Sequence, residues 1–390
     1  MKIAILTSGI MPVPAVQGGA VENLTDFYLA YNDQHRLHDM TVYSVWHPDV
    51  EKHPALKSQV NHYIYLKVNT LKAKLGKKML HWLKRKEEYY DYTIEYYLHE
   101  VIKDIRKKHY DCIIIENRPG YALKLKSVTA AKLVYHLHNE NLDCRASHAQ
   151  EIYDAASRII TVSDFIKSRV QTINPKDDKT ITVHNGINLA AFTRKDGIDR
   201  SKLGLNADDF VLVFSGRIAI EKGISEILEA MERLRDYPHI KLLAMGSAFY
   251  AAESKDGFAR NQKLKAERMK NQIVFTGFIP YSEMPAYLQL ADVAVVPSVW
   301  DDPFPTSVLE AQALGLPIIA TRRGGIPEEV SDENAILLNT DEHFVDNLVA
   351  AILDLYNDPV KCKAMAEASL NRARLFSNMA FAGEFISAID

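Results

Sequence analysis

The sequence contains few cysteines and no long apolar run. Its three cysteines, Cys112, Cys144 and Cys362, lie far apart in a chain of 390 residues and form no C-x-x-C pair. That spacing argues against a disulfide framework or a zinc cluster and fits reduced thiols. No window approaches the roughly 20 apolar residues of a membrane span, and the first apolar run is too short for a signal peptide. We therefore expect a soluble, cytoplasmic protein.

Two further patterns are missing, an excess of charge of one sign and a dinucleotide fingerprint. Lys and Arg number 47 and Asp and Glu 50, so the formal net charge is −3 and nothing draws the whole chain toward nucleic acid. The first loop lacks G-x-G-x-x-G, which disfavours an NAD-dependent dehydrogenase.

Short apolar runs alternate with helical stretches along the chain, in two series. The first series predicts strands at 3–6, 41–45, 112–115, 133–137 and 159–162, and the second at 210–216, 240–246, 273–277, 293–297 and 317–321. This alternation is typical of parallel sheets covered by helices, and the length exceeds that of most single cores. We predict an α/β protein of two Rossmann-like domains, 1–190 and 191–370. A last helix within 371–390 can pack back on the first domain.

The stretch FSGRIAIEKG, residues 214–223, follows a predicted strand. Gly216 turns the chain, and Arg217 and Lys222 flank a predicted helix start. Both cations suit phosphate oxygens, and a helix N-terminus adds free N–H groups. The alternative is that both are solvated surface charges.

A second stretch, residues 298–330, places Asp302 eight residues before Glu310, with a helix expected to begin near Thr306 or Ser307. Glu310 could then accept hydrogen bonds from two vicinal hydroxyls, as on a ribose, while Asp302 faces a second polyol such as a sugar. The alternative is that Glu310 is only a first-turn acid stabilised by the helix dipole.

Taken together, GRIAIEKG and DDPFPTSVLEAQALGLPIIATRRGGIPE resemble the retaining glycosyltransferases of family 4, which have the GT-B fold and an E-x7-E motif. VSDFIKS (162–168), VHNGIN (183–188) and the early glycine pair support the likeness. It implies two domains facing a cleft that holds a nucleotide-sugar donor. The chain departs from the motif at Asp302, where the family usually has Glu, which leaves the identity of the donor sugar open.

The resemblance also assigns roles to single residues. Gly18 and Gly19 resemble the loop that approaches the donor β-phosphate, although a turn needing positive φ would explain them as well. His138, at the end of a strand, resembles the active-site histidine, although a strand-end histidine is more often structural. His136 shares its face by the period of two, and Glu140 follows, so both are acceptor candidates.

The implied catalytic set is His138, Arg217, Lys222 and Asp302. The implied donor set is Gly18, Gly19, Gly216, Arg217, Lys222, Phe278, Asp302, Phe304, Pro305, Thr306, Ser307 and Glu310.

The resemblance implies retaining transfer of a hexosyl or N-acetylhexosaminyl group from a nucleotide-diphosphate sugar, in the family often UDP-linked, to a hydroxyl acceptor in surface polysaccharide or glycolipid assembly. Arg217 and Lys222 would stabilise the departing diphosphate. The chain contains no D-x-D sequence, so no bound metal is needed, and we expect neither metal nor cofactor. The alternatives are a nucleotide-sugar 2-epimerase of similar fold and a non-catalytic nucleotide-sugar-binding protein.

Residues 67–86 carry eight Lys and Arg and no acid, with Leu, Met and Trp interleaved. Such a segment can contact an anionic membrane at its surface. The alternative is a solvated helix whose apolar stripe packs on the first domain.

Overall fold

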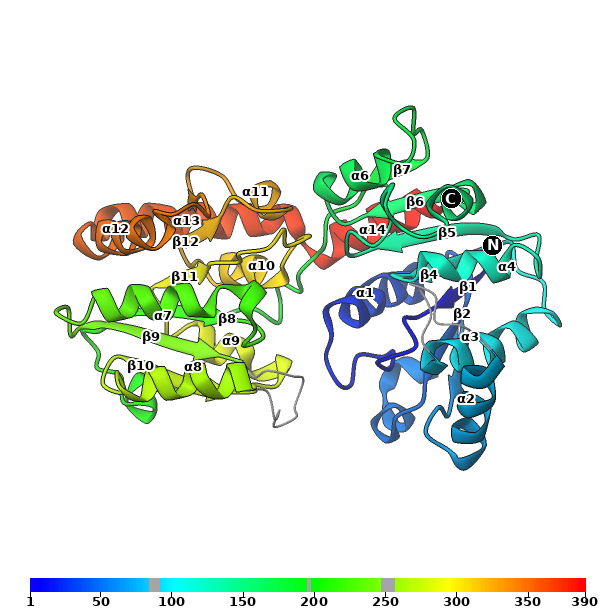
Figure 1. The fold of residues 1–390 in the computed structure, drawn as a ribbon, viewed down its shortest axis with the longest axis horizontal. Helices are drawn as coiled ribbons and strands as arrows, with labels where there is room; N and C mark the ends of the chain where they lie inside the picture. Colours follow the sequence, from blue (N-terminus) through cyan, green and yellow to red (C-terminus); the bar gives the residue numbers. More distant parts are fainter. Residues whose placement is uncertain (84–91, 195–197, 247–256) are drawn as a thin grey trace. The chain divides into compact units, whose positions relative to one another are not determined.

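The computed structural model of the protein describes residues 1–83, 92–194, 198–246 and 257–390, which form two compact units (Figure 1). The first unit comprises Met1–Asn185 together with Asn378–Asp390, and the second comprises Gly186–Ser377. The limits expected from the sequence were 190 and 370. The last thirteen residues therefore return to the unit in which the chain begins.

The first unit is built on a parallel sheet of seven strands in the order β3-β2-β1-β4-β5-β6-β7. Apolar residues follow one another without interruption along its two central strands, at 3–6 and 112–115, as burial on both faces requires. The strands are β1 (Lys2–Leu6), β2 (Asp39–Val45), β3 (Asn61–Leu66), β4 (Cys112–Glu116), β5 (Lys132–Leu137), β6 (Arg158–Thr161) and β7 (Thr180–Thr182).

Helices cover this sheet, and the last of them comes from the end of the chain. They are α1 (Ala20–His35), α2 (Leu71–Leu83), α3 (Tyr92–Ile105), α4 (Ala122–Leu125), α5 (Ala149–Ala155), α6 (Asp164–Gln171) and α14 (Asn378–Ile389), with short 3-10 turns at Pro48–Lys52, Pro54–Lys57 and Pro119–Tyr121. Helix α14 packs on α1, where the rings of Tyr28 and Phe385 stack with their centroids 4.4 Å apart. Because Phe381 and Phe385 are fully buried, α14 is part of the core of the first unit.

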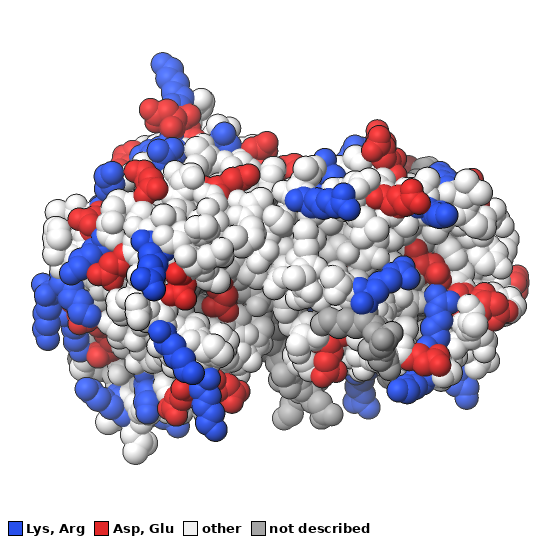
Figure 2. All heavy atoms as spheres, turned by 180° about the vertical axis from the view of Figure 1, so that it is seen from behind, with Lys and Arg blue, Asp and Glu red and all other residues white. Residues whose placement is uncertain are grey.

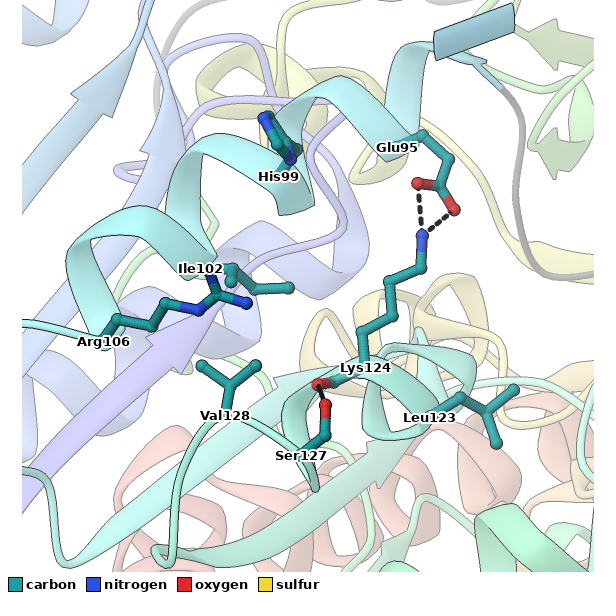
Figure 3. Close-up of a pocket in the computed structure, with 8 residues that line it drawn as sticks. All are labelled: Glu95, His99, Ile102, Arg106, Leu123, Lys124, Ser127 and Val128. Atoms are coloured by element: carbon teal, nitrogen blue, oxygen red, sulfur yellow. Dashed lines mark hydrogen bonds and ion pairs between the residues drawn. The ribbon is translucent and has the colours of Figure 1, made fainter. Parts of the chain in front are cut away.

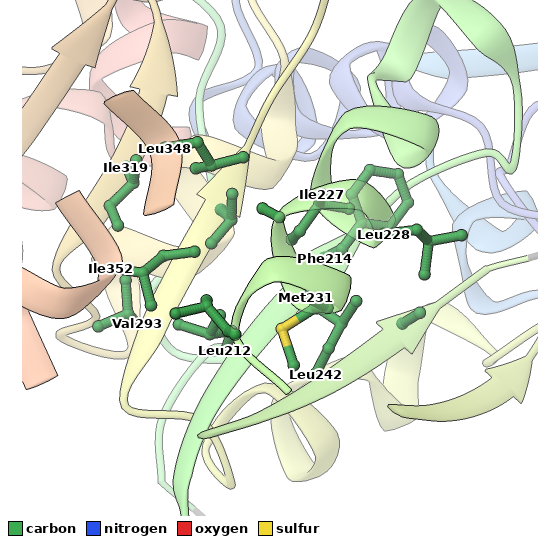
Figure 4. Packing of buried hydrophobic residues seen from close by; sticks show 14 of the residues in the cluster. Leu212, Phe214, Ile227, Leu228, Met231, Leu242, Val293, Ile319, Leu348 and Ile352 are labelled. Atoms are coloured by element: carbon green, nitrogen blue, oxygen red, sulfur yellow. The ribbon is translucent and has the colours of Figure 1, made fainter. Parts of the chain in front are cut away.

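The second unit is built on a parallel sheet of six strands in the order β10-β9-β8-β11-β12-β13. The strands are β8 (Phe210–Ser215), β9 (Ile240–Met245), β10 (Ile273–Gly277), β11 (Val293–Val296), β12 (Ile318–Thr321) and β13 (Ala335–Leu338). Leu212 of β8 and Val293 of β11 are buried against Met231 of α7 (Ile224–Arg233) and Ile352 of α12 (Phe344–Asn357), which cover one face of the sheet (Figure 4). The other helices are α8 (Gly257–Glu267), α9 (Met284–Leu288), α10 (Thr306–Ala313), α11 (Ile326–Glu329) and α13 (Pro359–Ala373), with 3-10 turns at Arg200–Leu203, Ile220–Lys222, Tyr281–Glu283 and Arg374–Phe376.

The predicted fold class is confirmed, because both sheets are parallel and covered by helices. All ten predicted strands are present, with ends that differ by at most two residues. Three strands were missed, β3, β7 and β13, which lie at the edges of the sheets.

The surface and the helices agree with the composition of the chain. Figure 2 shows Lys and Arg interspersed with Asp and Glu over the face in view, as the small net charge leads one to expect. Among the described residues, no helix combines the length and the apolar character needed to cross a membrane.

Candidate functional site

Each sheet has one topological switch point, where the chain turns to opposite sides of the sheet after two neighbouring strands. In the first unit it lies between β1 and β4, and in the second between β8 and β11. Ligands of open α/β sheets bind beyond the carboxyl ends of the strands at such points. Most of the residues singled out from the sequence follow these strands or their immediate neighbours.

In the second unit, the loops after β8 and β11 meet at a buried ion pair. Lys222 Nζ lies 2.5 Å from Asp302 Oδ2, and Ser298 Oγ donates to the same oxygen at 3.2 Å. Asp302 is only 4% exposed, and its backbone oxygen accepts from the N–H of Gly325 at 2.8 Å. The ammonium group of Lys222 also lies 5.6 Å from the ring centroid of Trp300, in cation–π range. The structure thus joins two residues that the sequence suggested separately.

Gly223 explains how Lys222 reaches this position. Its φ of +73° is costly for any residue with a side chain, and a Cβ there would lie 1.8 Å from the backbone oxygen of Pro297. Only glycine therefore lets the loop after β8 press against the end of β11, where Asp302 follows.

Glu310 lies in α10, which begins at Thr306 as the sequence predicted. It is 5% exposed, and burial raises the pKa of its carboxyl to about 7, although a hydrogen bond from Thr306 acts in the opposite direction. The carboxyl is near enough to Tyr281 that its charge helps to raise the pKa of that phenol, after burial. Glu310 is therefore a buried acid poised to change charge near neutral pH, which a first-turn acid at the surface would not be.

A third acid in this unit was missed from the sequence. Glu329, at the end of α11, is 0% exposed, and neither carboxyl oxygen has a hydrogen-bond partner in the described part of the chain. Burial raises its pKa well above the usual value, and the charges of Asp302 and Glu328 add to this, while Lys222 opposes it. Glu329 thus lies within electrostatic reach of the Lys222–Asp302 pair, and its surroundings favour the neutral form of its carboxyl.

The other residues suggested for the donor have various surroundings. Arg217 pairs with Glu221 at 2.9 Å and is half-exposed, and Gly216 has no positive φ. Phe304 is buried, with its ring 5.7 Å from that of Phe376 in an edge-to-face contact, which is a packing role. Pro305 is buried, Thr306 and Ser307 are half-buried in the first turn of α10, and Phe278 is exposed.

In the first unit, the residues that end β4 and β5 form a second buried cluster. Glu116 Oε2 lies 3.0 Å from His136 Nδ1 and 3.1 Å from His138 Nε2, and Tyr28 donates to Glu116 Oε1 at 2.9 Å. The two imidazole rings share one face, as the period of two predicted, with centroids 4.0 Å apart. The backbone N–H of His138 donates to Oδ1 of Asn117 at 3.1 Å, which fixes the end of β5.

The charges of this cluster follow from its contacts. Burial alone would raise the pKa of Glu116, but the charges and hydrogen bonds of His136 and His138 outweigh burial and hold that pKa low. Burial and the neighbouring His136 lower the pKa of His138 to about 4, against the opposite effect of Glu116. At neutral pH the cluster therefore holds a carboxylate and a neutral His138, whose Nε2 carries the proton that it donates to Glu116. Two imidazoles and one carboxylate are also a metal-ligating set, and their ligand atoms lie within 4.8 Å of one another.

The glycine pair Gly18-Gly19 precedes α1, after β1. Gly19 has φ +105°, and a Cβ on it would lie 2.3 Å from Oε2 of Glu22. Glu22 is 6% exposed, and burial raises its pKa to about 7, with a further contribution from the charge of Glu116. Gly18 also has positive φ, +77°, but open space around it. Both glycines therefore meet the positive φ of this turn, and Gly19 also lets the backbone pass close to the buried Glu22.

Two other features of the first unit lie apart from these residues. Glu140 forms an ion pair with Arg169 at 3.3 Å. A cavity of about 270 Å³ lies between α3 and α4, where Glu95 and Lys124 pair across it and Arg106 points toward it (Figure 3). None of the residues suggested from the sequence lines this cavity.

The comparisons with known proteins bear on both units. Residues 196–372 match the family described as "Glycosyl transferases group 1". The chain is 29% identical to a putative glycosyltransferase of Bacillus subtilis, YtcC, over 92% of this chain and 81% of the relative. It is 25% identical to spore coat protein SA of the same organism, over 85% of this chain and 84% of the relative.

Solved structures share the fold at low identity. Anabaena HepE in complex with UDP and glucose has a TM-score of 0.76 at 19% identity, covering 99% of this chain and 98% of that one. Sucrose-phosphate synthase of Thermosynechococcus elongatus has a TM-score of 0.74 at 20% identity, covering 99% and 98%. The fold is therefore the GT-B fold, with two Rossmann-like domains.

The sequence missed three buried acids, Glu22, Glu116 and Glu329. A signal for Glu116 was present, because an acid closes the apolar run of β4 next to β5, which contains His136 and ends just before His138. Glu22 follows the glycine pair by three residues, which also marks it. Glu329 carried no such signal, since its neighbour Glu328 shares its chemistry but is only half-buried.

Proposed function

We propose that the protein is a retaining glycosyltransferase that moves a hexosyl or N-acetylhexosaminyl group from a UDP-sugar to a hydroxyl acceptor, in surface polysaccharide or glycolipid assembly. The proposal rests on the Lys222–Asp302 pair at the switch point of the second unit, within the segment that matches the group 1 family. The Anabaena structures with UDP and UDP-glucose favour uridine as the donor base.

Four charged residues of the second unit then have a part in this reaction. The departing diphosphate carries growing negative charge, which Lys222 and Arg217 would stabilise as they exchange their carboxylate partners for phosphate oxygens. Asp302, released from Lys222, would accept a hydrogen bond from the donor sugar. Glu310 would accept hydrogen bonds from the ribose hydroxyls, and the free N–H groups in the first turn of α10 would donate to the donor phosphates.

In the first unit, His138 is proposed to contact the sugar as a neutral base. Since Nε2 donates to Glu116, Nδ1 is the nitrogen left to accept a hydrogen bond from a hydroxyl. Glu116 would act through His138 as a positioning residue, by fixing its tautomer and ring orientation. His136, which is buried, would hold the carboxylate of Glu116 in place through its own contact with it.

Incubation with a panel of UDP-sugars, with and without saccharide acceptors, tests the proposal. We expect UDP release that depends on an acceptor, and a product whose anomeric configuration by NMR matches that of the donor. An inverted product would refute the retaining mode. An isomerised UDP-sugar formed without acceptor would identify a 2-epimerase, and donor binding without turnover would identify a binding protein. We expect the activity to persist in the presence of a chelator, because lysine and arginine supply the positive charge.

A further inference from the structure

Helix α2 of the first unit has two apolar faces, and one of them is fixed against the protein. Ala73 and Leu80 are buried beside Tyr96 of α3. Gly76 lies on this face as well, and a Cβ there would lie 2.6 Å from Cε2 of Tyr96. Glycine therefore lets α2 approach α3 closely, and the contact sets the rotation of α2 about its own axis.

The opposite face of α2 carries an apolar stripe that points away from α3. It consists of Leu71, Leu75, Met79 and Trp82, at intervals of four, four and three residues, which is the spacing of one helix face. Their exposed fractions are 81%, 70%, 56% and 84%. Trp82 and Leu71 are the most exposed large apolar side chains among the described residues. A contiguous exposed stripe of this kind marks an interaction surface, unlike single exposed residues.

Lysines border this stripe on both sides, and the helix contains no acid. At about 100° per residue, Lys72 lies on one side of the stripe, and Lys74 and Lys78 lie on the other. All three are exposed. The remaining basic residues of the segment, Lys84, Arg85 and Lys86, lie outside the described residues.

An anionic lipid surface matches this pattern. An apolar stripe with lysines on both sides is the arrangement of a helix that lies in the plane of a membrane interface, where the stripe enters the acyl boundary and the ammonium groups reach the headgroup phosphates. We propose that α2 docks the protein on anionic membrane by inserting Leu71, Leu75, Met79 and Trp82. The proposal is independent of the sugar transfer, since it needs neither donor nor acceptor.

A second copy of the chain fits the same stripe less well. In a two-fold dimer the same patch meets itself, so the lysines beside the stripe in both copies would be brought together. Like charges so placed oppose association, whereas lipid phosphates neutralise them. The charge of the rim therefore favours lipid over self-association.

Co-flotation with vesicles tests the proposal on the full chain. We expect binding to vesicles of phosphatidylcholine mixed with phosphatidylglycerol, little binding to phosphatidylcholine alone, and release by high salt, which screens the lysines. Tryptophan fluorescence should shift to the blue on binding, and a Trp82→Phe variant should lose that shift while Trp46 and Trp300 remain.

Two matched pairs of variants separate the stripe from general surface effects. Leu75→Gln with Trp82→Gln should abolish binding, whereas Val360→Gln with Leu375→Gln, which changes exposed apolar residues of the second unit, should not. Replacing Lys72, Lys74 and Lys78 by Gln should weaken partitioning on the order of 100-fold. The control with equal charge change replaces Lys202, Lys263 and Lys270, which are exposed in the second unit, and should retain most of the binding.

Three outcomes overturn the proposal. One is a wild-type protein that does not float with anionic vesicles, and another is equal weakening by the α2 lysines and their controls. The third is self-association through the stripe. In that case the wild-type protein would be a dimer in light scattering and would bind no vesicles, and the Leu75→Gln, Trp82→Gln variant would be a monomer.

Discussion

The ammonium nitrogen of Lys222 lies 2.5 Å from Oδ2 of Asp302, joining residues that are 80 positions apart in the chain. The pair is held in place by Ser298 and by the close packing of Gly223. The pair links Lys222, proposed to stabilise the departing diphosphate, to Asp302, proposed to hydrogen-bond the donor sugar. One substitution in this pair therefore disturbs both binding and folding.

Replacing Lys222 by Ala should lower kcat on the order of 100- to 1,000-fold, because the departing diphosphate loses its nearest cation. The structure adds an effect on stability. Removal of Lys222 leaves the buried carboxylate of Asp302 without its charged partner, which costs about 3–5 kcal/mol of unfolding free energy.

The double variant Lys222→Ala, Asp302→Asn separates the two effects. It should recover much of the stability in denaturant unfolding and none of the turnover. Turnover of Lys222→Ala near the wild-type rate would remove the phosphate role of this residue.

Donor binding should depend on the charge of Glu310. Its pKa of about 7 means that the carboxyl is mostly protonated at pH 6 and mostly ionised at pH 8, and the ionised form accepts hydroxyl hydrogen bonds more strongly. The affinity for UDP-glucose, measured by calorimetry, should therefore rise as the pH rises through 7. Glu310→Gln should bind more weakly and without this dependence, while Glu333→Gln, an exposed acid, should behave like wild type. An unchanged affinity in Glu310→Gln would count against the ribose assignment.

Glu116→Gln should reduce kcat about tenfold to 100-fold, the equivalent of losing one hydrogen bond to a charged group. The donor dissociation constant should change little, since Glu116 is proposed to act only through His138. Glu116→Asp, which restores the charge, should recover part of the rate. Because the folded pKa of Glu116 is depressed, its stabilising effect is present above the ordinary value of 4.5 and is lost as the pH falls below it.

Metal analysis of the same variant distinguishes hydrogen bonding from ligation in this cluster. We expect the purified wild type to contain no stoichiometric metal at Glu116, His136 and His138. If the wild type contains a stoichiometric divalent ion and the Glu116→Gln variant does not, Glu116 is a metal ligand and not a residue that positions His138.

Glu329→Gln should stabilise the protein at high pH. The folded pKa of Glu329 is raised, so the neutral acid is favoured in the fold, and stability is lost as the pH rises above the ordinary carboxyl range. The melting temperature of Glu329→Gln should thus exceed that of the wild type by more at pH 8 than at pH 5. The variant Glu333→Gln should show no such trend, and the same difference at both pH values would contradict a buried neutral Glu329.

The sequence predicted those elements whose signal is local. Uninterrupted apolar runs such as 112–115 and 210–214 marked the inner strands, and the start of α10 followed from Thr306. The edge strand Asn61–Leu66 was missed because polar and aromatic residues interrupt its pattern. Contacts between distant segments could not be predicted from local patterns. The register of β4 against β5, for example, brings Glu116 opposite His136, and no single segment of the sequence determines that register.

The return of α14 to the first unit has a consequence for biosynthesis. Phe381 and Phe385 fill the core beside Tyr28, yet they are synthesised only after the whole second unit. The second unit, Gly186–Ser377, is synthesised completely before α14. It can therefore fold while the first unit still lacks the helix that covers part of its core. The half of the molecule synthesised first is thus the half completed last, and a nascent chain stopped before Asn378 would expose the apolar face that α14 covers.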